Sequence, residues 1–348
     1  MTEAVRAAFR DQATACAALG SPQTARLLAG LADAMTGDTA VAARVLGWPG
    51  DPSWRGESVA LRLAGGLHAL VLGGQDGALA AAYADPAAVS DRQLVAVAQA
   101  AMARHEAFLL RWIDSAPQTN EVRRSAVLIA AGNWLAARVG LPLVLSELGA
   151  SAGLNLIWDR YRLTVPGGEM GPPDAALHLA PDWHGQAPVI CPPVVAARAG
   201  VDLNPLDPGS DRLRILSYVW PDQADRLART AQAAGMAAGL GVHPARGDAV
   251  DWLATRLQVP LPGRLHLVFH TIAWQYFTAQ AQARGLAMLE AAGTRAAADT
   301  PLAHLAMEAD GHPDGAAVTL RLWPGGDTIP LGRADFHGRW VDWRAPAA

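Results

Sequence analysis

The stretch VLSELGASAGLNLIWDRY, residues 144–161, decides the fold because it joins a short apolar run to a turn of small residues. Residues 143–147 predict a strand that is buried on both faces, bounded upstream by a glycine and a proline. Residues 149–153 have small side chains only, so a ligand can approach their backbone closely. We expect a helix to begin at Leu154, with an N-terminus that favours anions and carboxylates.

The composition is that of a globular protein. The chain has 348 residues, 51% hydrophobic and 17% charged, which is enough for two domains or one large domain. A formal charge of −4 and a pI near 6.2 provide no basic field, so nucleic acid is not indicated as a partner. Cys16 and Cys191 lie far apart, which argues against a disulfide framework and favours a reducing cytoplasm. All 28 basic residues are arginine, which excludes Schiff-base chemistry and a P-loop lysine.

Neither a membrane segment nor a metal site is predicted. The N-terminus lacks the apolar region of a signal peptide, and the most apolar later stretch, residues 59–72, contains Arg62 and His68. The histidines and cysteines show no short ligand spacing, so we expect no metal.

The chain predicts two domains. Residues 1–139 have apolar positions at helical spacing, which indicates an N-terminal all-helical domain. Residues 140–348 alternate apolar runs with helical periods, as is typical of an α/β, Rossmann-like, mostly parallel sheet. The proline-rich residues 166–200 predict an irregular insertion or lid. Strands are expected at 143–147, 161–165, within 194–201, around 245, and at 265–270, 302–308 and 317–323; helices are expected at 59–72, 91–113, 121–139, 211–236, 248–257 and 275–292.

The glycine turn fits two catalytic motifs. An acidic residue followed by alternating small residues, Glu147-x-Gly149-x-Ser151-x-Gly153, resembles the first motif of Rossmann-like S-adenosylmethionine (SAM) methyltransferases, with Ser151 in place of the middle glycine. Residues 149–153 also satisfy GxSxG, the nucleophile elbow of serine hydrolases. A third interpretation is a turn kept small only for packing.

The order of the elements favours the methyltransferase interpretation. A hydrolase elbow follows several strands, whereas this turn follows the first strand after an all-helical region. A triad of Ser151, Asp248 and His270 in hydrolase chain order keeps the serine hydrolase as the main alternative.

The methyltransferase resemblance implies a set of cofactor-binding residues. Asp202, after a second strand, would hold the ribose hydroxyls, although Glu169 has the more usual spacing from Glu147 and competes for this role. Asp248 would accept from the adenine amino group, or simply cap the next helix. His270, at the end of the fourth strand, is the candidate general base or substrate partner, or a structural histidine. The cofactor-binding candidates are Glu147, Gly149, Ser151, Gly153, Asn155, Asp202, Asp248 and Ala249.

Several segments together are similar to a bacterial family of uncharacterised proteins, a domain of unknown function that spans nearly the whole chain. These segments include TNEVRRSAVL, RAGVDLNP, YVWPDQADR, RGDAVDWL and LVFHTIAWQYF. The resemblance implies a helical N-terminal part and a methyltransferase-type core. Substrate-pocket candidates within it are Asn120, Glu121, Arg124 and Trp220, with Asp222 and Arg226 nearby; a helix cap and a solvated helix face are the alternatives.

These observations lead to three hypotheses. The first is a SAM-dependent methyltransferase acting on a small molecule, with SAM as cofactor. The second is a non-catalytic SAM- or nucleotide-binding protein of the same fold, suggested by Ser151. The third is a serine hydrolase. Neither the substrate nor the oligomeric state is indicated by the sequence.

Overall fold

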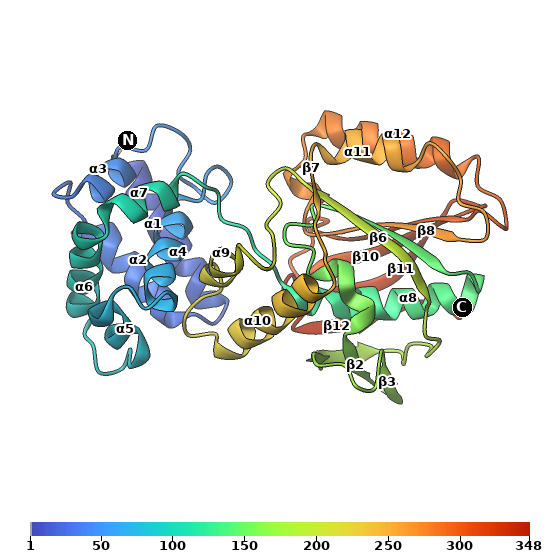
Figure 1. Cartoon of the computed structure of the whole chain (residues 1–348), viewed down its shortest axis with the longest axis horizontal. Coiled ribbons are helices and arrows are strands. Elements are labelled where there is room, and N and C mark those ends of the chain that lie inside the picture. The colour runs from blue at the N-terminus through green and yellow to red at the C-terminus, as the bar shows by residue number, and fades with distance from the viewer. Residues whose placement is uncertain (1) are drawn as a thin grey trace. The chain divides into compact units, whose positions relative to one another are not determined.

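The computed structural model describes residues 2–348, which form two compact units (Figure 1). The first unit contains the residues up to Thr119 together with Ser210–Ala231, and the second contains Asn120–Gly209 and Gln232–Ala348. This division differs from the expected boundary after residue 139, because residues 120–139 belong to the second unit and a later segment belongs to the first. Among the described helices, none is both long and apolar enough to cross a bilayer.

The first unit is built from helices. Two long helices expected from periodicity are each broken in two. Residues 91–113 break at His105, where the buried carboxylate of Asp76 binds both Arg104, at 2.7 Å, and His105, at 3.1 Å. Residues 211–236 break near Pro221, which has no N–H to donate and disfavours helical geometry in the residue before it. The helices are α1 Thr2–Ala18, α2 Pro22–Ala34, α3 Ala40–Leu46, α4 Val59–Leu72, α5 Gly77–Ala84, α6 Asp91–Arg104, α7 Glu106–Ile113, α9 Arg212–Ser217 and α10 Ala224–Gly239, which extends past the unit boundary.

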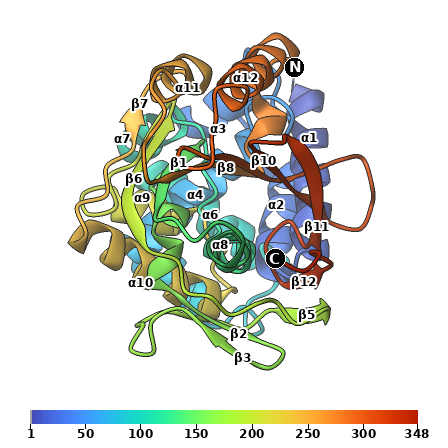
Figure 2. The same ribbon diagram turned by 90° about the vertical axis from the view of Figure 1, so that its right-hand side faces the viewer.

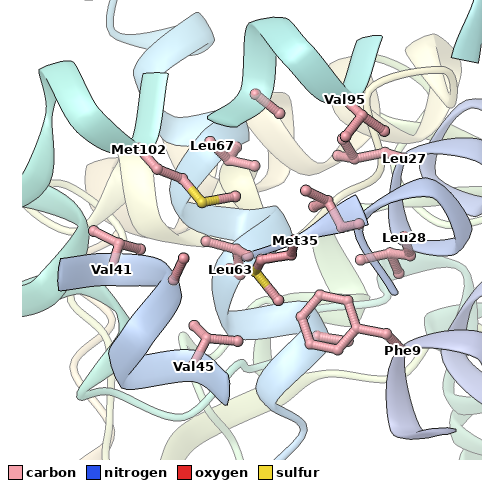
Figure 3. Packing of buried hydrophobic residues seen from close by; sticks show 14 of the residues in the cluster. Phe9, Leu27, Leu28, Met35, Val41, Val45, Leu63, Leu67, Val95 and Met102 are labelled. Atoms are coloured by element: carbon pink, nitrogen blue, oxygen red, sulfur yellow. The ribbon is translucent and has the colours of Figure 1, made fainter. Parts of the chain in front are cut away.

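An apolar core holds these helices together. Figure 3 shows side chains from α1, α2, α3, α4 and α6 converging on one cluster. α1 and α2 each bury one face at three- and four-residue spacing, which is the pattern that the sequence predicted, whereas α4 is buried on nearly all sides. Central members are Phe9, Leu27, Leu28, Met35, Val41, Val45, Leu63, Leu67, Val95 and Met102.

The later segment, Ser210–Ala231, completes this first unit. A Cβ on Gly65 of α4 would overlap the ring of Tyr218, so the glycine makes room for that ring. His68 Nδ1 lies 3.2 Å from the Ser217 carbonyl oxygen. Asp222 accepts hydrogen bonds from the Ser21 hydroxyl and the Gln23 amide, and therefore caps α2.

The second unit contains a nine-stranded sheet in the order β5-β12-β11-β10-β9-β8-β1-β6-β7. The five strands from β9 to β7 in this order are parallel to one another, whereas β10, β11 and β12 form an antiparallel continuation. The large, mostly parallel sheet confirms the α/β class, and every expected strand from 143 onward except 161–165 lies in it. The strands are β1 Leu143–Leu148, β5 Asp182–Gly185, β6 Val195–Asp202, β7 Ala245–Arg246, β8 Leu265–Thr271, β9 Leu302–Glu308, β10 Ala316–Trp323, β11 Asp327–Ala334 and β12 Trp340–Trp343.

Helices cover both faces of this sheet. In Figures 1 and 2, α11 (Ala249–Arg256) and α12 (Ala279–Gly293) lie over one face, and α8 (Ser125–Val139) lies over the other. Every residue of β1 and β8 is buried as a result, and this includes the polar residues Ser146, Glu147, His266, His270 and Thr271.

Two expectations for the chain after β1 are wrong. The strand near residues 161–165 exists as β2 (Arg162–Val165), but it pairs with β3 (Gly168–Met170) and β4 (His178–Leu179) in a separate three-stranded sheet. Residues 166–200 are therefore not wholly irregular, since they include β3, β4, β5 and the start of β6. Local periodicity predicts a strand but does not specify the sheet in which it pairs.

Candidate functional site

The glycine turn after β1 is not followed by the expected α-helix. The residues that follow form a 3₁₀ helix, η2 Asn155–Arg160, interrupted by non-helical angles at Ile157. Three residues of the turn, Gly149, Ser151 and Gly153, have positive φ angles of 71°, 49° and 69°. Because the following segment is a short, interrupted 3₁₀ helix, no regular α-helix directs its N-terminus at the turn.

The backbone amides of the turn are all used within the protein. This arrangement differs from a turn whose amides are open to an anion. The donors and acceptors are Gly149 N and Ala150 N to Val201 O (3.0 Å each), Ser151 N to Asp202 Oδ2 (2.9 Å), Ala152 N to Asn120 Oδ1 (3.2 Å) and Gly153 N to Ala150 O (2.7 Å).

Neighbouring side chains fill the space that the turn glycines leave. A Cβ on Gly149 would lie 2.7 Å from the Cβ of Ala273, in the loop after β8. A Cβ on Gly153 would lie 2.6 Å from Val242. The small residues of the turn are therefore required by packing as well as by positive φ.

Glu147 lies at the carboxyl end of β1 and is 3% exposed. Its Oε2 has no hydrogen-bond partner within residues 2–348. Burial raises the pKa of this carboxyl group well above its usual range, the nearby carboxylate of Asp202 raises it further, and the Arg124 guanidinium opposes both effects. Glu147 is thus a buried acid with an unused acceptor oxygen.

Asp202 ends the neighbouring strand β6 and lies beside the glycine turn. Its two carboxylate oxygens accept from Ser151 N, at 2.9 Å, and Asn204 N, at 2.8 Å. The competing candidate, Glu169, lies in β3 and forms an ion pair with Arg162. The structure therefore places Asp202, and not Glu169, next to the turn.

Residues that directly precede α8 form hydrogen bonds with the glycine turn and with neighbouring segments. Asn120 accepts from the turn, and its Nδ2 is buried without a partner among the described residues. Asn155 Nδ2 donates to the carbonyl oxygen of Glu121. Arg124 donates to the carbonyl oxygens of Phe336 and Thr271. These contacts are structural ties between segments of the second unit.

Asp248, Ala249 and Trp220 have local roles in the structure. The Oδ1 atom of Asp248 accepts from the amides of Val250 and Asp251, so it is the N-cap of α11. Ala249 is the first residue of that helix and is buried. Trp220 belongs to the first unit, where it packs against the apolar core.

His270 is a buried structural residue at the end of β8. Its side chain is 2% exposed, with Nδ1 2.7 Å from Glu308 Oε1 and Nε2 2.9 Å from His304 Nε2. The ring stacks on Trp274, with centroids 4.8 Å apart. Both ring nitrogens are occupied, so His270 is not free to act as a general base on a ligand.

The hydrolase triad is not assembled. His270 bonds to Glu308 and His304, and Asp248 caps α11 and faces Arg284. A nucleophile–base–acid chain through Ser151 would require His270 to bond to Ser151 on one side and to Asp248 on the other. The serine hydrolase interpretation is therefore not supported by this geometry.

Comparison with known proteins places the chain in a family. Residues 6–343 match the model described as "Uncharacterized protein conserved in bacteria (DUF2332)". The chain belongs to this family. No curated protein and no solved structure matches it.

In this DUF2332 member, one residue of the site, Glu308, is not among the residues that the sequence predicted. Glu308 ends β9 and accepts from His270 Nδ1, Ala273 N and Trp274 N through a single oxygen. The sequence does contain a signal, because Glu308 is an acidic residue at the end of a predicted parallel strand. No motif links it to the glycine turn, and only the pairing of β9 with β8 brings it beside His270.

Proposed function

We propose that this chain is a cytoplasmic SAM-dependent methyltransferase that acts on a small molecule. The order of its parallel strands supports this proposal. From β1 the chain adds β6 and β7 on one side, then returns to add β8 and β9 on the other. In doubly wound folds, ligands bind outside the carboxyl ends of the strands where the order reverses. Here that position lies between β1 and β8.

The observation that carries the proposal is the buried, unused oxygen of Glu147 at this position. A buried polar atom without a partner costs free energy, and in a native protein each one calls for an explanation, such as strain, a catalytic role or a bound group. Asp202 lies close enough to raise the pKa of Glu147. Two acidic groups at neighbouring strand ends match a ligand that brings positive charge and several donors, as SAM does through its sulfonium, ammonium and ribose hydroxyls.

Recognition in this proposal depends on side chains and not on the turn amides. Those amides already have acceptors, and the space beside Gly149 and Gly153 is filled by other residues, so the turn itself contributes no polar contact. Glu147, Asp202 and Asp248 would provide the polar contacts.

Calorimetric titration with SAM and with S-adenosylhomocysteine tests the proposal. We expect both to bind the full-length chain. We expect Glu147→Gln to weaken binding of SAM at least tenfold, because the positive charge of SAM would draw the buried Glu147 into its ionised form and glutamine cannot ionise. Glu290→Gln is the matched control, since Glu290 lies on α12 with its side chain 51% exposed. Absence of binding by both ligands would contradict the proposal.

A non-catalytic SAM-binding protein is the second candidate. The observation that favours it is the engagement of both His270 nitrogens, which removes the expected base. Formation of S-adenosylhomocysteine in the presence of a metabolite mixture would separate the enzyme from the binding protein.

A further inference from the structure

A second carboxyl group with an unused oxygen, that of Glu308, lies on the other side of the strand-order reversal, with its side chain 14% exposed. Glu308 Oε1 accepts from His270 Nδ1 at 2.7 Å, from Ala273 N at 2.9 Å and from Trp274 N at 3.1 Å. Three donors saturate that oxygen. Glu308 Oε2 is also buried, and no described residue donates to it.

The surroundings keep Glu308 ionised. Burial on its own raises its pKa, but the hydrogen bond and charge of His270 and the amides of Ala273 and Trp274 outweigh burial, so the pKa lies below the ordinary value. An ionised oxygen in a desolvated setting requires a donor.

His270 orients this carboxylate. Because an ionised carboxylate can only accept, His270 Nδ1 is the donor to Glu308. Its other nitrogen faces His304, whose pKa is lowered well below its usual range by burial, then by His270 and Arg321. Stacking on Trp274 fixes the ring plane, with an interplanar angle of 13°.

The loop after β8 connects Glu308 to the glycine turn. Ala273, whose amide donates to Glu308, is the residue that packs against Gly149. Ile272, one position earlier, has a φ of 51°, a strained value for a β-branched residue. Glu147 and Glu308 therefore lie on either side of one packed contact between the turn and this loop.

We propose that Glu308 is a ligand-binding carboxylate that takes the ammonium group of an amine, with His270 as its positioning residue. This inference rests on the proposed function in one respect, namely that it names the substrate class of the same site. A cation is favoured over a neutral hydroxyl because the Glu308 carboxylate is ionised and its free oxygen is shielded from water.

Ligand-observed NMR titration tests the assignment at pH 7. The probes are tyramine and butylamine, with tyrosol and butanol as their uncharged counterparts. We expect an amine to bind wild-type protein at least tenfold more tightly than its alcohol. Glu308→Gln should abolish this preference, because it retains an acceptor for the two amides and loses the charge. Glu290→Gln should retain the preference.

Three further variants keep the test decisive if Glu308→Gln does not fold. Glu308→Asp keeps the charge, but the shorter side chain moves the carboxylate away from the amine. This variant should weaken amine binding about tenfold. His270→Asn retains an N–H near the Nδ1 position and should preserve the preference, whereas His270→Leu should reduce it. A merely structural role for His270 would make both His270 variants equivalent in amine binding.

Three results would overturn the inference: no preference for amines, an equal preference in Glu308→Gln, or a loss of SAM affinity in Glu308→Gln as large as the loss of amine affinity. The third would assign Glu308 to the cofactor. Glu308-dependent amine binding without any SAM binding would refute the proposed methyltransferase and leave the ammonium site. SAM binding without an amine preference would support the proposed function and refute the ammonium site.

Discussion

Burial controls the protonation of two side chains on the strands β1 and β8, with opposite consequences for stability. Glu147 is an acid whose pKa is raised by burial, and His266 is a base whose pKa burial lowers to about 4. In each case the folded protein favours the neutral form. Each group therefore contributes its own pH dependence to the free energy of unfolding.

For Glu147 we predict that stability falls as pH rises. Between its ordinary pKa of 4.5 and the higher folded value, the folded state binds more protons than the unfolded state. Glu147→Gln removes this term. Urea unfolding from pH 4 to pH 8 should show the variant gaining stability relative to wild type as pH increases. A constant difference across this range would contradict a raised pKa.

For His266 we predict the opposite slope. The Ser146 hydroxyl lies 2.8 Å from His266 Nε2 and accepts from Arg256 at 3.1 Å, and the charge of Arg256 adds to burial in lowering the pKa of His266. The folded pKa of about 4 lies below the ordinary 6.5, so stability is lost as pH falls between these values, by about 3 kcal/mol in total. His266→Gln should flatten that part of the profile. If stability fell with decreasing pH as steeply in His266→Gln as in wild type, His266 would not be responsible for that loss.

At the scale of elements, the contact between the turn after β1 and the loop after β8 is the decisive one. Gly149 has positive φ and leaves space for Ala273, and the same loop supplies two amides to Glu308. The geometry of both candidate carboxylates therefore depends on this contact.

We predict that Gly149→Ala destabilises the protein by about 2–4 kcal/mol, from a strained φ and from overlap with Ala273. The double variant Gly149→Ala with Ala273→Gly removes the overlap but not the strain. A double-mutant cycle should therefore give a coupling of about 1 kcal/mol or more. Coupling near zero would mean that Ala273 does not fill the space beside Gly149.

At the scale of the whole molecule, the first unit is discontinuous in sequence. Ser210–Ala231 supplies Tyr218 against Gly65, and Asp222 as the cap of α2. An N-terminal fragment would leave these groups of α4 and α2 without their partners.

We predict that a fragment of residues 1–119 does not melt cooperatively, because part of its core packing and one helix cap are lost. The same fragment joined by a flexible linker to residues 210–231 should recover a cooperative transition by circular dichroism. A scrambled 210–231 segment is the control. Equal melting of all three fragments would show that the later segment is dispensable.

The sequence by itself determined the features that depend on neighbours along the chain. Short runs rich in apolar residues predicted the strands β1, β6, β8, β9 and β10. In β1, β8 and β9 the runs reflect burial on both faces, whereas burial in β10 largely alternates along the strand. The small residues at 149–153 likewise predicted a turn, and the structure shows positive φ at Gly149 and Gly153 within it.

Only the tertiary structure decided which distant groups meet. Helical periodicity could not reveal that residues 210–231 complete the first unit. It also could not reveal that Glu308 forms a hydrogen bond with His270. It also could not show that the turn amides find acceptors in Val201, Asp202 and Asn120. Strand pairing and side-chain packing act between residues far apart in the chain, and their free energy depends on positions in space that no local pattern encodes.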